Sequence, residues 1–273
     1  MEGEELSVRP FKGSKDLICC VDIGNTTTVC GLFQRDGLLL RSFRFRTRSE
    51  ITPEELLLLL RSFGETFEFS WSEVKAVVLA SVVPPLEEIW EEVVRRWLVK
   101  EWLLASAKEV PIPVKLRYPQ EVGADRVVNA YAAWKKFRRA TIVVDYGTAT
   151  TFDCVSEKGE YLGGAIAPGL ESAAESLFAK TAKLPRVDFG TIPDSVLGRD
   201  TASAIRSGLL YGFAALTEGL VARLSEEMGT SPLVLATGGL AATIASLCPR
   251  IERLEPHLTL EGLFYLYRER LER

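Results

Sequence analysis

Apolar residues recur along this chain with two different periods. Short, unbroken apolar runs predict buried strands, and apolar residues spaced three or four positions apart predict helices. The predicted strands are residues 17–22, 28–33, 38–45, 74–82, 141–145, a hairpin that turns at 157–159 and ends at 165, and 233–236. The predicted helices are residues 53–63, 86–98, one that opens at 123–126, one from 169, 201–228, one from 240, and 260–271. This alternation predicts the α/β class, with two mixed sheets that each contain a hairpin.

One segment of the chain occurs twice. Ile18–Phe33 reads ICCVDIGNTTTVCGLF and Thr141–Val155 reads TIVVDYGTATTFDCV, so each has an apolar strand, an Asp, a Gly and a run of Thr. The matching residues are Asp22 and Asp145, Gly24 and Gly147, Asn25 and Thr148, Thr27 and Thr150, and Thr28 and Thr151. A repeat of about half the chain indicates two similar lobes.

Both segments have the chemistry of a phosphate cradle. An Asp at a strand end can direct a metal ion, and the Gly turn after it offers backbone N–H groups beside small hydroxyls. One copy alone equally fits a solvated β-turn, whereas two copies favour a nucleotide held between two lobes. We expect an N-terminal extension over residues 1–16, a first lobe over 17–138 and a second over 139–273, whose final helix could pack back across the lobes.

Composition and charge narrow the class of protein. The chain has 273 residues, 47% of them hydrophobic, which is enough to bury the cores of two such lobes. Its net charge of −4 gives no basic surface for nucleic acid, and an apolar run such as Leu56–Leu60 is far too short to span a membrane. Met1–Asp16 is charged and lacks the apolar centre of a secretory signal, so we expect a cytoplasmic protein.

Cysteine and histidine form no catalytic or metal-binding pattern. The five cysteines have no CxxC spacing, so we interpret them as reduced, buried hydrophobic residues. They are Cys19, Cys20, Cys30, Cys154 and Cys248. The single histidine, His257, is expected at the surface or in a loop.

Three polar junctions lie where predicted elements begin or end. Asp125 stands near the start of the helix that follows Gly123, and Asp200 precedes the long helix, so each fits either an N-cap or a site residue. Thr237 and two glycines connect a buried strand to a helix, which suits close approach by a phosphate or a flat ligand.

Taken together, eight motifs resemble the ordered motif set of type III pantothenate kinases over about residues 17–265. They are DIGNT at Asp22, SVVPP at Ser81, YPQEVGADR at Tyr118, VDYGTATTFD at Val144, GGAIAPG at Gly163, TAKLP at Thr181, GRDT at Gly198 and TGG at Thr237. The resemblance implies the fold of the acetate kinase, sugar kinase, Hsp70 and actin superfamily. In that fold, two duplicated ribonuclease-H-like lobes of mixed sheet and flanking helices enclose a nucleotide cleft.

The resemblance also implies a reaction. ATP would phosphorylate the primary hydroxyl of pantothenate to give 4′-phosphopantothenate, the first step of coenzyme A biosynthesis, with Mg²⁺ and a monovalent cation, K⁺ or NH₄⁺. The enzyme would be a homodimer. The predicted helix 201–228 agrees with this, because its apolar residues form a band wider than packing against one sheet requires. Alternatively, the final helix, 260–271, could cover this band within the same chain.

Residue roles follow from the resemblance, motif by motif. Asp125 would accept the proton, Asp145 would ligate the monovalent cation, and Asp22 would hold Mg²⁺ through water. The ATP-binding residues would be Asp22, Ile23, Gly24, Asn25, Thr26, Thr27, Thr28, Val29 and Thr148. The pantothenate-binding residues would be Tyr118, Gly123, Ala124, Asp125, Arg126 and Thr201.

Two other functions remain open. Another kinase or phosphatase of the superfamily, acting on a sugar, an acyl acid or polyphosphate, would keep the Asp22 and Asp145 segments but lack the motifs at Tyr118 and Gly198. A non-enzymatic regulator resembling the Bvg accessory factor proteins would share the family's sequence without depending on catalysis. The intact set of motifs favours the kinase.

Overall fold

The computed structural model describes residues 16–99, 101–180 and 185–272 and divides the chain into two compact units. The first unit is Met1–Ser106 with Leu263–Arg273, and the second is Ala107–Gly262. These bounds differ from the expected lobes, because the segment 107–138 belongs to the second unit and the end of the chain returns to the first. Residues 1–15 of the expected extension and 181–184 of the TAKLP motif lie outside the described residues.

Each unit is built on a five-stranded mixed sheet, and the two sheets have the same strand order, β3-β2-β1-β4-β5 and β8-β7-β6-β9-β10. The first sheet consists of β1 (Leu17–Ile23), β2 (Thr27–Phe33), β3 (Leu39–Arg46), β4 (Val74–Ser81) and β5 (Glu101–Leu104). The second consists of β6 (Thr141–Tyr146), β7 (Ala149–Val155), β8 (Tyr161–Pro168), β9 (Leu233–Thr237) and β10 (Arg253–Leu254). In both sheets the first three strands are antiparallel and the last two run parallel to the first. The duplication read from the sequence is therefore confirmed.

Helices of the first unit cover one face of its sheet and bury Trp90 in the core. Helix α1 (Pro53–Thr66) begins at a capping box, in which the Thr52 hydroxyl accepts from the Glu55 N–H and the Glu55 carboxylate accepts from the Thr52 N–H. Helix α2 (Pro84–Val93) continues as a π turn, η2 (Val94–Leu98), where the sequence predicted one uninterrupted helix. A short 3₁₀ turn, η1 (Trp71–Glu73), precedes β4.

The aromatic side chains of the final helix, α7 (Leu258–Glu272), contact residues of the first unit. Phe264 stacks on Phe33 with ring centroids 5.0 Å apart, and the Tyr267 hydroxyl donates to Glu101 at 2.9 Å. These contacts do not support the alternative in which this helix covers the long helix of the second unit.

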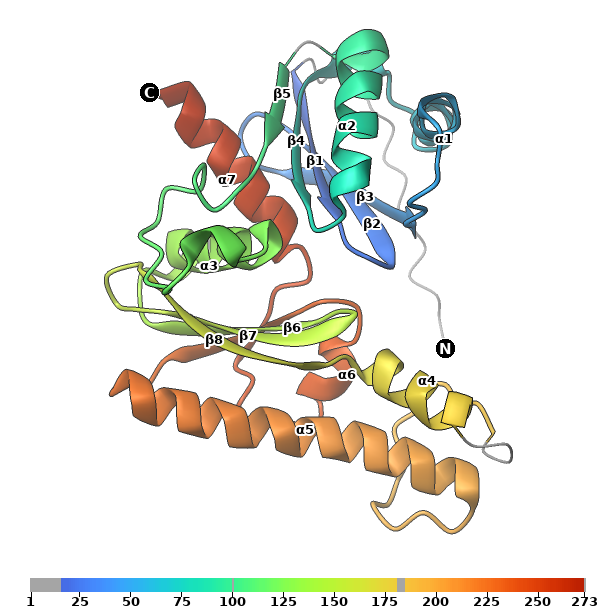
Figure 1. Cartoon of the computed structure of the whole chain (residues 1–273), viewed down its shortest axis with the longest axis vertical. Helices are drawn as coiled ribbons and strands as arrows, with labels where there is room; N and C mark the ends of the chain where they lie inside the picture. The colour runs from blue at the N-terminus through green and yellow to red at the C-terminus, as the bar shows by residue number, and fades with distance from the viewer. Residues whose placement is uncertain (1–15, 100, 181–184, 273) are drawn as a thin grey trace. The chain divides into compact units, whose positions relative to one another are not determined.

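In the second unit, α3 (Ala124–Phe137) lies on one face of the sheet and α5 (Thr201–Met228) runs along the other (Figure 1). The other helices are η3 (Pro119–Glu121), α4 (Leu170–Lys180) and α6 (Ala241–Ala245). Five of the apolar residues that made α5 look too wide for one contact are buried in the unit's own core. They are Leu209, Leu210, Phe213, Ala214 and Val221.

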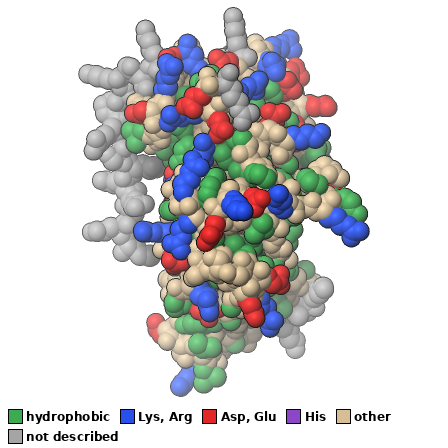
Figure 2. Space-filling view, turned by 90° about the vertical axis from the view of Figure 1, so that its left-hand side faces the viewer, with side chains coloured by type: hydrophobic (Ala, Val, Ile, Leu, Met, Phe, Trp, Pro, Cys, Tyr) green, Lys and Arg blue, Asp and Glu red, His purple; other side chains and the backbone are tan. Residues whose placement is uncertain are grey.

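The cores account for the cysteines, all five of which are free and buried. His257 lies half-buried in the turn before α7. Among the described helices, none combines the length and apolarity that crossing a bilayer requires. Figure 2 shows basic and acidic side chains interspersed over the face that it draws, which agrees with the small net charge of −4.

Candidate active site

The turn between β1 and β2 carries the first predicted phosphate segment. Asp22 lies near the end of β1 and is half-buried, and the Gly24 N–H donates to the Thr27 carbonyl at 3.1 Å. Thr47, just after β3, braces this turn: its hydroxyl donates to the Gly24 carbonyl at 2.7 Å, and its N–H donates to the Thr26 carbonyl at 2.9 Å. Asn25 and Thr26 are therefore exposed at the tip of a turn whose backbone is fixed.

The turn between β6 and β7 is braced in a similar manner by the start of α4. The Thr148 carbonyl accepts from the Gly169 N–H at 3.1 Å and from the Ser172 hydroxyl at 2.9 Å. A side chain at Gly169 would collide with the backbone of this turn, so the close approach requires glycine.

Strand pairing corrects one part of the predicted repeat. Thr28 pairs with Ile23 next to the first turn, and Thr150 pairs with Tyr146 next to the second. Thr28 and Thr150, both buried, are thus equivalent, and the predicted matches of Thr27 with Thr150 and of Thr28 with Thr151 are wrong by one position. The reason is that the second turn is one residue shorter, and an ungapped alignment cannot show this.

Asp145 lies near the end of β6, where the backbone of the TGG motif approaches it closely. Its Oδ2 accepts from the Asn129 amide at 3.1 Å. A Cβ atom at Gly238 would stand 2.5 Å from Asp145 Oδ1 and 2.6 Å from the Tyr146 carbonyl oxygen, so this close approach of the backbone requires glycine. Gly238 belongs to the TGG motif, which β9 places here because Thr237 pairs with Asp145. Carboxylate and carbonyl oxygens are suitable ligands for K⁺.

Two further carboxylates lie close to Asp145. Burial, followed by the charges of Asp125 and Asp153, raises the pKa of Asp145 to about 7. Burial also raises the pKa of Asp125 and of Asp153. Within the described residues, no three His, Cys, Asp or Glu side chains converge as a metal site. A cation here would therefore rest on the Asp145 carboxylate and on neutral oxygens, and the surrounding negative charge would favour it.

Asp125 occupies the second position of α3 and is not its N-cap. The N-cap is Gly123, which makes no side-chain cap bond, and Asp125 Oδ1 accepts from the Arg126 N–H at 2.8 Å. The interpretation of Asp125 as a cap is therefore wrong. Asp200, in contrast, is a true cap, since its Oδ1 accepts from the Ser203 N–H at 2.8 Å in a capping box at the start of α5.

Arg126 is held by Asp153 of β7. Its Nε and Nη2 donate to Asp153 Oδ1 at 2.8 and 2.7 Å. The Asp153 side chain is 0% exposed and that of Arg126 is 16% exposed. No role was predicted from the sequence for Asn129 or Thr47, or for Asp153, the last residue of the VDYGTATTFD motif. A charged residue in the middle of the apolar strand TTFDCV was a signal that could have found Asp153, because a buried carboxylate requires a partner.

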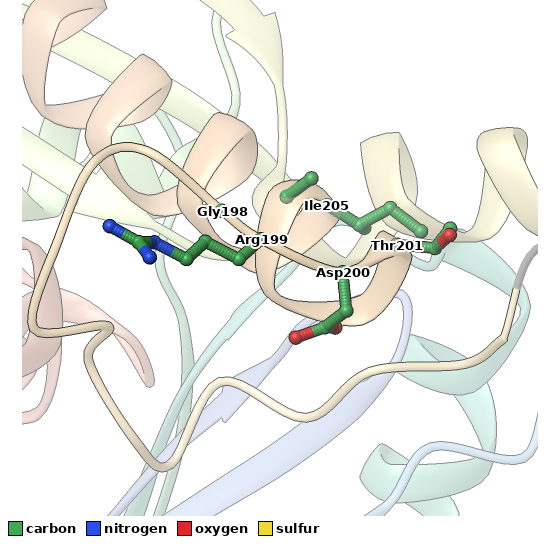
Figure 3. A pocket seen from close by; sticks show the side chains of 6 residues that line it. Gly198, Arg199, Asp200, Thr201 and Ile205 are labelled. Atoms are coloured by element: carbon green, nitrogen blue, oxygen red, sulfur yellow. The ribbon is translucent and has the colours of Figure 1, made fainter.

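A hollow of about 560 Å³ opens at the start of α5 and contains Thr201. It is lined by Gly198, Arg199, Asp200, Thr201, Ala204 and Ile205. Figure 3 shows the Arg199 and Thr201 side chains pointing in opposite directions, with Asp200 between them. Tyr118 is 50% exposed on the segment before α3, with the Arg117 guanidinium 5.6 Å from its ring centroid.

The structure thus assembles part of the predicted site within the second unit. Asp125, Arg126 and Asp145 come together, along with the TGG turn. Thr201 and Tyr118 make no hydrogen bond to that group in the described part of the chain. The residues predicted to bind the phosphates, Asp22 to Val29, lie in the first unit.

Two similar units, each with a carboxylate and a braced Gly turn at the end of its first strand, define a fold of the sugar kinase and actin class. The structure is similar to that of a ROK family glucokinase from Streptomyces griseus in complex with glucose and AMPPNP, with a TM-score of 0.57 and 13% identity over 93% of this chain and 99% of that one. A Baf family protein from Campylobacter jejuni gives a TM-score of 0.59 and 19% identity over 94% and 100%. At such identities the likeness shows the fold alone.

The chain belongs to the type III pantothenate kinase family. The family model of that description matches residues 18–223. A type III pantothenate kinase from Desulfosudis oleivorans is 45% identical over 249 residues, which cover 90% of this chain and 97% of that protein. Another, from Syntrophus aciditrophicus, is 42% identical over 253 residues, 92% of this chain and 99% of that protein. The resemblance drawn from the motifs is confirmed.

Proposed function

We propose that this chain, a pantothenate kinase by family, transfers the γ-phosphoryl group of ATP to the primary hydroxyl of pantothenate at the beginning of coenzyme A biosynthesis. The observation that carries the residue-level proposal is Asp125, a half-buried carboxylate that caps no helix and lies close to Arg126 and Asp145. A carboxylate that costs free energy to bury and has no capping role is a candidate for chemistry.

Asp125 acts as the proton acceptor. In phosphoryl transfer through a loose transition state, the attacking hydroxyl keeps its proton until late, so the acceptor mainly orients that hydroxyl. The hydroxyl oxygen forms a bond to the γ-phosphorus, the bond from that phosphorus to the ADP oxygen breaks, and the proton passes to the Asp125 carboxylate. Burial raises the pKa of Asp125, which brings the carboxyl closer to the range in which a general base works best.

The turn from Asp22 to Val29 binds the ATP phosphates, with Thr148 of the second turn contributing. Support comes from the fixed backbone of the first turn, because prepositioned donors stabilise phosphoryl oxygens without further reorganisation. Asp22 fits a water-mediated Mg²⁺ site, since Mg²⁺ usually keeps several waters and uses one or two carboxylates besides phosphate oxygens. When bound, that ion would neutralise the charge of the phosphate groups.

Asp145 and the Tyr146 carbonyl, whose oxygens both lie beside Gly238, hold the monovalent cation, K⁺ or NH₄⁺. Their role is to place a positive charge beside carboxylates that would otherwise repel the phosphates. Gly123, Ala124 and Arg126 at the start of α3 contact pantothenate. Arg126 supplies a fixed charge for its carboxylate or amide oxygens.

Tyr118 and Thr201 complete the acceptor site, and a second copy of the chain closes it. The support for a homodimer is a row of small, exposed residues along α5, around which open space remains at each glycine. The row consists of Ala204, Gly208, Gly212, Ala215 and Gly219. The free, buried cysteines agree with a reducing compartment such as the cytoplasm.

A coupled ADP-release assay with a panel of acceptors tests the function. With ATP, Mg²⁺ and K⁺, we expect turnover with pantothenate and none above background with glucose, acetate or polyphosphate. Turnover of another acceptor but not of pantothenate would assign the chain to a different kinase of the superfamily. A protein that binds ATP and turns over no acceptor would favour the regulatory alternative.

The same assay tests the cation. At constant ionic strength, K⁺ and NH₄⁺ should support the reaction, and Na⁺ should support it poorly, because its smaller radius suits a different arrangement of ligands. Equal rates in all three salts would remove the monovalent cation from the proposal.

A further inference from the structure

We infer that Asp153 is a positioning residue of the acceptor site, which fixes the guanidinium of Arg126 for its contact with pantothenate. This inference rests on the proposed function, in which Arg126 contacts pantothenate. It assigns a role to a buried charge that the proposed mechanism otherwise leaves unused.

Both oxygens of the Asp153 carboxylate accept hydrogen bonds, and these fix its position. Its Oδ1 accepts from Arg126 Nε at 2.8 Å, from Arg126 Nη2 at 2.7 Å and from the Tyr161 hydroxyl at 2.7 Å. Its Oδ2 accepts from the Thr151 hydroxyl at 3.1 Å. Two charge-assisted bonds to one oxygen hold the guanidinium in place against Asp153. The remaining 16% exposure of Arg126 leaves an edge of this group accessible to a ligand.

The duplicated fold does not itself need a carboxylate at this position. Strand pairing makes Asp153 equivalent to Gly31, because Gly31 pairs with Cys20, two residues before Asp22, and Asp153 pairs with Val143, two residues before Asp145. A buried ion pair is often no more stabilising than apolar residues of similar volume. The ion pair of Asp153 with Arg126 is therefore specific to the second unit, and we attribute it to the acceptor site and not to the stability of the fold.

The surroundings of Asp153 join two parts of the predicted acceptor site. Arg126 is the third residue of α3, directly after Asp125. Tyr161 begins β8, and its backbone bonds to the segment that leads to Tyr118: the Tyr161 N–H donates to the Pro113 carbonyl, and the Lys115 N–H donates to the Tyr161 carbonyl, both at 2.8 Å. Asp153 thus connects the start of α3 with the strand that anchors the Tyr118 segment.

Steady-state kinetics of four variants test the inference, after the wild type has been shown to turn over pantothenate. The variants are Asp153→Asn, Arg126→Met, the double variant of the two, and Tyr161→Phe as the matched control. We expect Asp153→Asn to raise KM for pantothenate about tenfold or more, as for the loss of a charge-assisted bond, and to change KM for ATP less than about twofold. Tyr161→Phe removes one donor to the same oxygen but leaves both bonds to Arg126, so its KM for pantothenate should rise less than about threefold.

The double variant separates positioning from general support of the fold. If Asp153 acts through Arg126, the double variant should bind pantothenate no more weakly than Arg126→Met alone, because neighbouring residues that work as one unit are not additive. The inference is wrong if Asp153→Asn leaves KM for pantothenate unchanged, if the two effects multiply, or if both KM values rise together with a lower melting temperature.

A second variant keeps the test decisive if Asp153→Asn does not fold. Asp153→Glu retains the buried charge and displaces the carboxylate by one methylene, so it should also raise KM for pantothenate selectively. An unchanged KM in that variant overturns the inference. A wild type without pantothenate turnover would count against the proposed function and not against this role of Asp153.

Discussion

Asp125 and Asp200 are the same residue type at the same kind of junction, yet only Asp200 caps its helix. The sequence alone allowed both interpretations for each. The difference arises because α3 begins at Ala124, before Asp125, whereas α5 begins at Thr201, directly after Asp200. Such a distinction depends on backbone geometry within a single turn, which residue types and spacing do not determine.

The proposed role of Asp125 as proton acceptor predicts how its replacement by Asn affects the reaction. Asp125→Asn should lower kcat by about 10²-fold or more, the usual range for a general base, and leave the melting temperature nearly unchanged, because the Asn side-chain oxygen can still accept from the Arg126 N–H. The measurements are kcat in the coupled assay and thermal unfolding. Asp36→Asn, the same change in the exposed β2–β3 turn, is the control and should alter neither. Retained activity with early melting would reduce Asp125 to a structural residue.

Asp145 predicts a dependence of stability on pH. Its pKa is raised to about 7 in the folded chain, so between the unfolded value near 4 and pH 7 the folded state binds more protons than the unfolded state, and its free energy of unfolding falls as pH rises. Asp145→Asn removes the ionisable group and therefore this decrease in the free energy of unfolding. In buffer without K⁺ or NH₄⁺, the melting temperature of the variant relative to wild type should therefore rise by a few degrees from pH 5 to pH 8. A difference that stays constant, or that falls with pH, would contradict this.

The strands and helices themselves were largely predictable. The long α5 was predicted with the bounds Thr201–Met228 that the structure gives it, and the start of α1 at Pro53 was also predicted. The strands β5 and β10 were not predicted, because four and two residues are too few to show a period. The π turn after α2 was missed for a different reason. Its apolar spacing matches that of an ordinary helix, and only the hydrogen bonds distinguish the two.

Thr47, which holds the β1–β2 turn, predicts a selective effect on KM for ATP. Thr47→Val keeps the shape of the side chain but removes its hydroxyl bonds to the Gly24 carbonyl and to the Thr28 hydroxyl, so the turn loses part of its rigidity. KM for ATP should rise about fivefold or more, the range for the loss of two hydrogen bonds, with KM for pantothenate unchanged. Thr47→Ser retains the hydroxyl and should behave as wild type. Equal changes in both constants would show that the turn does not serve ATP alone.

The two units have the same strand order, and the repeated segment in the sequence predicted this similarity. The repeat and its family resemblance gave the fold class. The unit boundaries could not be read in the same way, because the end of α7 returns to the first unit through contacts between residues far apart in sequence, such as Phe264 with Phe33. The buried pair of Arg126 and Asp153 depends equally on such distant contacts.

The proposed homodimer predicts the mass of the protein in solution and the effect of a variant that separates the two chains. We expect wild-type protein at micromolar concentration to sediment with twice the 30.2 kDa mass of one chain. Gly212→Arg should give single chains with a raised KM for pantothenate, because open space at Gly212 lets one chain accept the side chain while a neighbour packed there could not. Leu58→Arg, on the exposed side of α1, is the control and should remain dimeric. A fully active wild-type species with the mass of one chain would contradict the shared site.

The central claim is that this chain phosphorylates the primary hydroxyl of pantothenate with ATP. Its most direct test is ³¹P NMR of purified protein incubated with ATP, Mg²⁺, K⁺ and an equal amount of pantothenate. We predict one new phosphomonoester resonance, coupled to the protons of the adjacent methylene group, that grows in equal amount with ADP. ADP that accumulates together with inorganic phosphate, or ATP that remains intact beside unmodified pantothenate, would contradict the claim.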